Sequence, residues 1–229
     1  EIERLSVSKA FIITGTTIAT RTGLIQRIKD LIGDKYAGLF HGTRQHVPRG
    51  TVVEGADAVR RSGADLLLSI GGSTCSDTAK AIILMLCEGL TEAYELEKYR
   101  VRFHRPDRIE APRLTGEAMP HIAVPTTLSG GEHNNSLGIT DEERRVKDLY
   151  TAPQLTPKVV ILDPAVTTPT PMWLWLSTGI RALDHAVEAI YSTRAQPFTD
   201  TLCLKAIHIL FRHLPECAEE PESLDARLR

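Results

Sequence analysis

Short apolar runs alternate with amphipathic stretches over the first two thirds of the chain. A continuous apolar run such as residues 65–70 is typical of a strand buried on both faces, whereas apolar spacings of three and four indicate a helix. The predicted strands are 9–13, 37–40, 65–70, 121–124 and 159–162, and the predicted helices between them are 22–32, 52–62 and 76–87. This alternation predicts an α/β fold with a parallel sheet and right-handed crossovers.

The pattern becomes purely helical after residue 167, with apolar periodicity over 176–191 and 200–211. Residues 88–119 are polar and predict an irregular surface excursion, and the first residues predict a short helix. We therefore expect an α/β domain at 1–165, followed by the beginning of an all-α domain at 166–229. The last six residues are also helical and lack a Gly or Pro stop, so we expect the helical domain to continue.

Composition and charge argue against several classes of partner and location. The 229 residues carry a formal charge of −2 without a basic stripe, so nucleic acid is not an expected partner. No run approaches the roughly 20 apolar residues of a membrane span, and the acidic amino end is unlike a secretory signal. Four cysteines without a CxxC pair indicate reduced thiols. We expect a cytoplasmic protein.

One corner of the predicted sheet is suited to an anion. After the strand at 65–70 come Gly71, Gly72, Ser73 and Thr74, which open a helix without bulky side chains. Free N–H groups and the positive end of the helix dipole then meet at one point. The segment fits neither GxGxxG nor a P-loop, because Lys80 lies six residues past Thr74 and is expected to face along the helix. A plain tight turn is the alternative.

A second loop of this kind favours a dinucleotide as the ligand. The strand at 121–124 opens into Pro125, Thr126 and Thr127, followed by Gly130 and Gly131. The carboxyl ends of parallel strands share one edge of the sheet, where ligands bind in a crevice. Two such glycine-rich loops at one edge of the sheet suit the two halves of a dinucleotide.

The ordered motifs resemble the iron-containing alcohol dehydrogenase family, and most of all its maleylacetate reductase branch. The motifs are Gly71-Gly72-Ser73-Thr74 with Asp77 and Lys80, Pro125-Thr126-Thr127 with Gly130 and Glu132, Gly138-Ile139-Thr140 with Lys147, Asp163-Pro164, and Thr178-Gly179 with Ala182-Leu183, His185-Ala186 and Glu188. The branch is suggested by His46-Val47-Pro48 and by Glu188-Ala189-Ile190-Tyr191. The resemblance covers nearly the whole chain. It implies a dinucleotide-binding α/β domain, a helical domain as in dehydroquinate synthase, and hydride transfer between them.

The resemblance also implies roles for single residues in binding NAD(P)H. Gly71, Gly72 and Ser73 would hold the pyrophosphate, with Asp77 near the nicotinamide end. Thr126 and Thr127 would line the adenine and ribose side, and Lys147 would bind the nicotinamide ribose. Two structural alternatives stay open: Ser73 or Asp77 caps the helix, and Lys147 is simply solvated.

Gly15 bears on the choice between NAD and NADP. NAD-selective relatives carry an acid after the first strand, where it accepts from the ribose 2′-hydroxyl and repels a 2′-phosphate. Here that place is Thr14-Gly15-Thr16-Thr17, without an acid. We expect Gly15 to border the cofactor and NADPH to be tolerated.

The residues at the expected metal site differ from those of the metal-dependent members of the family. Metal-dependent members carry an Asp and a His four residues apart on one helix, and the matching residues here are Arg181 and His185. A permanent guanidinium cation cannot ligate a metal, so no metal is expected and His185 is a doubtful ligand. We expect Arg181 to bind a substrate carboxylate or carbonyl and His185 to protonate the carbonyl oxygen. The alternative is an Arg181–Asp184 ion pair within the helix.

These observations favour an NAD(P)H-dependent reductase of a small oxo or enone acid that needs no metal. The alternatives are a metal-dependent alcohol dehydrogenase that uses Asp184 as a ligand, and a dinucleotide-binding protein without catalysis. The expected partner is a small carbonyl or alcohol substrate. A homodimer is a further expectation, because an exposed half-bundle of helices favours association. The sequence does not identify the substrate.

Overall fold

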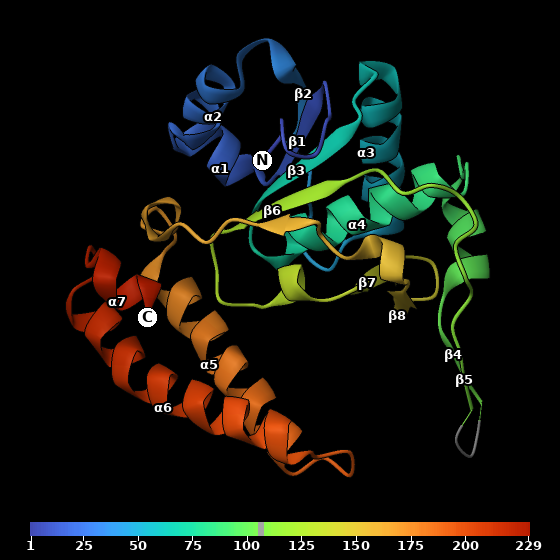
Figure 1. The fold of residues 1–229 in the computed structure, drawn as a ribbon. Coiled ribbons are helices and arrows are strands. Elements are labelled where there is room, and N and C mark those ends of the chain that lie inside the picture. Colours follow the sequence, from blue (N-terminus) through green and yellow to red (C-terminus); the bar gives the residue numbers. More distant parts are fainter. Residues whose placement is uncertain (105–107) are drawn as a thin grey trace. The chain divides into compact units, whose positions relative to one another are not determined.

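The computed structural model describes residues 1–104 and 108–229, and the chain forms two compact units (Figure 1). The first unit consists of residues 1–125 and 131–161, and the second of residues 126–130 and 162–229.

The first unit is built on a five-stranded parallel sheet. Its strands are β1 (Ala10–Thr14), β2 (Tyr36–Phe40), β3 (Leu66–Gly71), β6 (His121–Pro125) and β9 (Val159–Val160), in the order β2-β1-β3-β6-β9. Every neighbouring pair is parallel, which confirms the predicted α/β class. The chain runs outward from β1 to β2 and then returns past β1 to β3. The strand order therefore reverses between β1 and β3, the point where open α/β sheets bind ligands.

Helices pack against this sheet. They are α1 (Thr16–Arg21), α2 (Leu24–Ile32), α3 (Arg49–Ser62) and α4 (Ser73–Cys87), with short 3-10 turns at η1 (Gly33–Lys35), η3 (Gly131–His133) and η4 (Pro153–Leu155). Phe11, Ile13 and Leu67 share one core with the buried residues of α3 and α4. Helix α4 is buried along most of its length, including Ile82 and Ile83.

The predicted helix 22–32 is wrong at its start. Helix α1 begins at Thr16, and an extended Thr22 separates it from α2. The hydroxyl of Thr22 donates to Ile18 O at 2.7 Å, and such back-bonding competes with the helix hydrogen bonds. The first residues, expected to be helical, form turns, and the last predicted strand ends at Val160 instead of residue 162.

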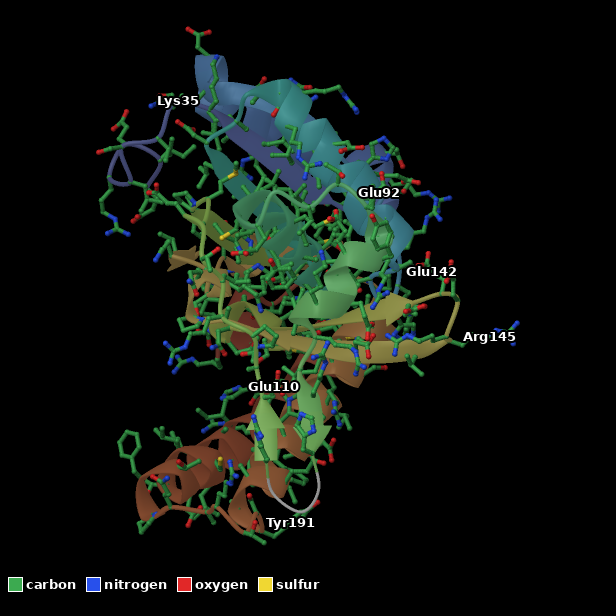
Figure 2. The ribbon with its side chains drawn as sticks, turned by 90° about the vertical axis from the view of Figure 1, so that its right-hand side faces the viewer. Lys35, Glu92, Glu110, Glu142, Arg145 and Tyr191 are labelled. Carbon is green, nitrogen blue, oxygen red and sulfur yellow. The ribbon has the colours of Figure 1, made fainter. Side chains whose placement is uncertain are left out.

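The polar stretch 88–119 is more regular than expected. It contains η2 (Ala93–Tyr99) and an antiparallel pair, β4 (Arg102–His104) and β5 (Arg108–Glu110). The sequence analysis also missed a hairpin of β7 (Ser136–Asp141) and β8 (Val146–Thr151). Figure 2 shows Glu142 and Arg145 at the tip of this hairpin, with the Arg145 side chain pointing away from the unit.

A buried arginine fixes that hairpin. Arg49 Nη1 lies 2.8 Å from the Asp141 carboxylate, and Nη2 lies 3.2 Å from Asp148 and 3.1 Å from Glu97. Nη2 also donates to the Tyr150 hydroxyl at 3.3 Å. The backbone N–H and guanidinium of Arg144, together with Arg49, lower the pKa of Asp141 to about 2. The network joins α3 and η2 to both strands of the hairpin.

The second unit is helical, as expected. It contains η5 (Pro164–Thr167), α5 (Met172–Ile190), α6 (Pro197–Glu219) and α7 (Leu224–Leu228). Its core is Trp175, Cys217 and Ala226, and the Arg227 guanidinium lies 4.8 Å above the Trp175 ring. A Cβ at Gly179 would lie 2.4 Å from Leu214, so α5 and α6 pack closely there. Among the described residues, no helix is both long and apolar enough to cross a membrane.

Replacing Arg49 with methionine should lower the free energy of unfolding by roughly 1–3 kcal/mol, because Asp141 and Asp148 then keep only the partly exposed Arg144 as a cation. Urea unfolding followed by circular dichroism measures this. Arg4→Met is the control, since the Arg4–Glu1 pair is exposed and should be worth at most about 1 kcal/mol. Equal costs for the two variants would contradict a central role for Arg49.

Candidate functional site

Two glycines lie side by side where the strand order reverses. Thr14 pairs with Ile70, so Gly15 and Gly71 follow from neighbouring strand ends. Gly71 has φ +145°, and a Cβ there would lie 2.4 Å from Cys75 Sγ. Only glycine allows this turn from β3 into α4.

The amino end of α4 is open to an anion. Its N-cap is Gly72, which provides no side-chain hydrogen bond to the helix. The alternative that Ser73 or Asp77 caps the helix is therefore wrong. Ser73, the first helical residue, instead lies against Gly131, where an added Cβ would approach the Ser73 Cβ to 3.1 Å. The first N–H groups of α4 and its positive dipole end stay available to a phosphate.

The loop after β2 completes this corner, and the sequence analysis missed it. Gly42 forms a β-bridge with Gly15. The Thr43 hydroxyl donates to Thr14 O at 3.0 Å and lies 3.6 Å from Cys75 Sγ. The signal in the sequence for this loop was the Gly42-Thr43 pair, which comes shortly after the predicted strand 37–40. Residues 41–43 include no acid, and neither does the loop after β1.

Lys80 does not face along the helix as expected; it is fully buried beneath the corner. Its Nζ donates to Gly131 O, to Ser136 O at 3.0 Å and to Asn134 Oδ1 at 3.3 Å. Asp77 Oδ1 lies 3.7 Å away. Burial lowers the pKa of Lys80, and Asp77 opposes that shift. The ammonium group thus joins α4 to the segment that leads into β7.

The charge of Lys147 acts on Asp77. Burial raises the pKa of Asp77, while the charges of Lys80 and Lys147 and the backbone N–H of Gly138 lower it. Lys147 lies on β8 and is exposed, as the solvated alternative also expected. Asp77, Lys80 and Lys147 therefore form one charged group at the start of α4.

Thr126 and Thr127 belong to the second unit and are buried there. The carbonyl of Thr126 accepts from the Thr170 hydroxyl at 2.8 Å, and the Thr127 hydroxyl lies 2.9 Å from Ser129 Oγ. The N–H of Leu128 donates to the Thr178 hydroxyl on α5 at 3.1 Å. The helical unit thus fixes the threonine loop.

Arg181 and His185 lie one turn apart on the exposed side of α5. The Arg181 guanidinium forms an ion pair with Asp184, as the alternative interpretation predicted. Both side chains of this pair are about half exposed, at 58% and 47%. The pair is therefore solvated, and the guanidinium can reorient toward another anion.

Arg181 and its ion pair with Asp184 are unfavourable for a divalent cation beside His185, because a guanidinium cannot ligate a metal and adds repulsion. Among the described residues, one group of carboxylates is close enough to hold a metal: Glu97, Asp141 and Asp148. Arg49 and Arg144 already neutralise this group. We therefore derive no chemical step through a metal.

Comparisons with known proteins agree with this geometry. Residues 1–164 match the family model described as iron-containing alcohol dehydrogenase, and residues 175–229 match that of the family's C-terminal part. The chain is 32% identical to NAD-dependent methanol dehydrogenase from Bacillus methanolicus and 27% identical to maleylacetate reductase from Rhizobium sp.. Each match covers 99% of this chain but 56% and 54% of the relative. The chain thus spans about half the length of these relatives.

A solved structure shows the same fold. The crystal structure of maleylacetate reductase from Agrobacterium tumefaciens aligns with a TM-score of 0.77 at 25% sequence identity. The alignment covers 100% of this chain and 55% of that chain.

Gly71→Ala should weaken dinucleotide binding at least about tenfold, because the new Cβ forces the first turn of α4 away from Gly71; strain of this kind costs roughly 1–3 kcal/mol. Titration of NADH fluorescence measures the Kd. Gly23→Ala is the control, since a methyl there meets nothing within 4 Å and φ is −78°. Unchanged affinity in Gly71→Ala would show that the ligand does not use this corner.

Proposed function

Because the chain belongs to the iron-containing alcohol dehydrogenase family, we propose that the whole protein is an NAD(P)H-dependent reductase of a small oxo or enone acid that acts without a metal. One observation carries the cofactor part: the open amino end of α4 lies at the strand-order reversal, with Gly71 and Gly15 side by side. The relatives' names, a methanol dehydrogenase and a maleylacetate reductase, support dinucleotide chemistry on alcohols and oxo acids.

The cofactor's anionic middle fits the backbone of this corner. Gly71, Gly72 and Ser73 would hold the pyrophosphate through N–H groups at the start of α4. Asp77 and Lys147 would contact the nicotinamide half, where Lys147 can donate to ribose hydroxyls. Thr126 and Thr127 would line the adenine and ribose side. When bound, the nicotinamide supplies the hydride.

Arg181 and His185 would act on the substrate. The guanidinium of Arg181 presents paired donors that match a carboxylate, so it would orient an oxo acid. His185, one turn further along α5, would donate a proton to the carbonyl oxygen during hydride transfer. The acid group of the proposed substrate is inferred from Arg181, whose charge favours an anionic ligand.

The similarity to a methanol dehydrogenase supports a second candidate, a metal-dependent alcohol dehydrogenase in which Asp184 and His185 bind the cation. Its distinguishing property is dependence on a bound metal. Dinucleotide binding without turnover of any carbonyl would instead support a binding protein.

In the full protein, oxidation of NADPH by small oxo acids should continue unchanged after treatment with EDTA. Arg181→Gln should raise the KM for an oxo acid about tenfold or more, because a charged hydrogen bond to the carboxylate is lost. Neutral aldehydes serve as the control substrates, and their KM should change little. Activity that disappears with EDTA and returns with iron or zinc would favour the metal-dependent candidate.

Introducing an acid at Gly15 should select against NADP. Gly15 has φ −90°, and an added Cβ would lie 3.6 Å from the Thr43 hydroxyl, so a side chain fits. In Gly15→Asp the carboxylate would repel the 2′-phosphate, and we expect the Kd for NADPH to rise about tenfold relative to that for NADH. Isothermal titration of both cofactors measures this ratio. An unchanged ratio would exclude Gly15 from the ribose site.

A further inference from the structure

Gly138 on β7 lies under the side chain of Lys147. A Cβ added at Gly138 would lie 2.2 Å from Cε, 3.1 Å from Cδ and 3.2 Å from Cγ of Lys147. The lysine stem therefore crosses the space that any other residue at position 138 would fill.

The strand register explains this contact. Gly138 pairs with Leu149, and Thr140 pairs with Lys147. Gly138 and Lys147 are therefore diagonal neighbours on one face of the hairpin, a separation that long side chains bridge. The backbone of Gly138 is not among those with positive φ, so its conformation alone does not require glycine. Glycine inside a strand weakens the strand and often marks a close approach.

The contact between Gly138 and Lys147 matters because the lysine carries a charge that acts on Asp77. This charge lowers the pKa of the Asp77 carboxyl. Asp77 pairs with Lys80 at 3.7 Å, and within residues 1–104 and 108–229 no carboxylate forms an ion pair with the exposed Lys147, so its ammonium group can reach a ligand. The N–H of Gly138 faces the same carboxylate and also lowers its pKa.

We propose that Gly138 is a positioning residue whose missing side chain forms the channel that directs Lys147 to the cofactor. This inference rests on the proposed function, because Lys147 is the group that would bind the nicotinamide ribose. A methyl group at position 138 would displace the flexible lysine stem while leaving the backbone of β7 in an ordinary conformation.

A double-mutant cycle tests the proposal in the full protein: wild type, Gly138→Ala, Lys147→Ala and the double variant, each titrated with NADH. We expect Lys147→Ala to raise the Kd about tenfold, the loss of one charged hydrogen bond. Gly138→Ala should raise it several-fold, and the double variant should match Lys147→Ala alone. Similar weakening by Gly138→Ala in both backgrounds would overturn the proposal, as would no effect in the presence of Lys147.

A second readout needs no cofactor. Because the Lys147 ammonium lowers the pKa of Asp77, displacing it should raise that pKa in Gly138→Ala and in Lys147→Ala alike, with no further rise in the double variant. Titration of the Asp77 carboxyl carbon by NMR measures this, with Gly50→Ala as the matched control, where a methyl meets only Glu142 Oε1 at 3.4 Å. An unchanged pKa in Gly138→Ala would overturn the proposal. If wild type fails to bind NADH, the proposed function fails, and the pKa still decides whether Gly138 directs Lys147.

Discussion

One buried cation, the Lys80 ammonium group, joins the start of α4 to the segment that leads into the β7–β8 hairpin. Lys80 Nζ lies beneath α4 and donates to carbonyl groups of Gly131 and Ser136, residues that follow it by 51 and 56 positions. Gly131 packs on Ser73 at the start of α4, and Ser136 begins the hairpin that carries Lys147. The amino end of α4 and the hairpin are thus joined by the same ammonium group. A buried lysine persists only where such partners replace its lost hydration.

Charged side chains and a helix dipole meet at the start of α4. The charges of Lys80 and Lys147 act on Asp77, and buried Glu132 acts on Lys80, so two cations and two carboxylates lie near the positive end of the α4 dipole. The hairpin that presents Lys147 is fixed from its other side by Arg49, which pairs with Asp141 and Asp148 and thereby keeps them from adding negative charge. Arg49 and Arg144 therefore compensate the carboxylates of the hairpin, and the amino end of α4 contributes free backbone N–H groups and the positive end of its dipole.

The sequence predicted what local pattern determines. The strand, the two glycines and the helix after Gly71 could be predicted because a buried apolar run and glycine are sufficient signals. The hairpin at 136–151 could not, because polar Lys147 and Asp148 break its apolar alternation and its stability comes from Arg49, about 90 residues earlier. Lys80 likewise has the spacing from Asp77 of an ordinary surface pair. Its burial depends on contacts that only the folded chain creates.

The two interpretations of Arg181 are compatible once exposure is considered. Its ion pair with Asp184 confirms the structural one, but an exposed pair of this kind contributes at most about 1 kcal/mol. A carboxylate substrate that forms paired hydrogen bonds can therefore compete for the guanidinium. Asp184 would then bind the guanidinium in place of the substrate carboxylate and keep Arg181 oriented until a substrate binds. A permanent cation one turn from His185 is unfavourable for a divalent metal at that place, and the same charge would favour an anionic substrate.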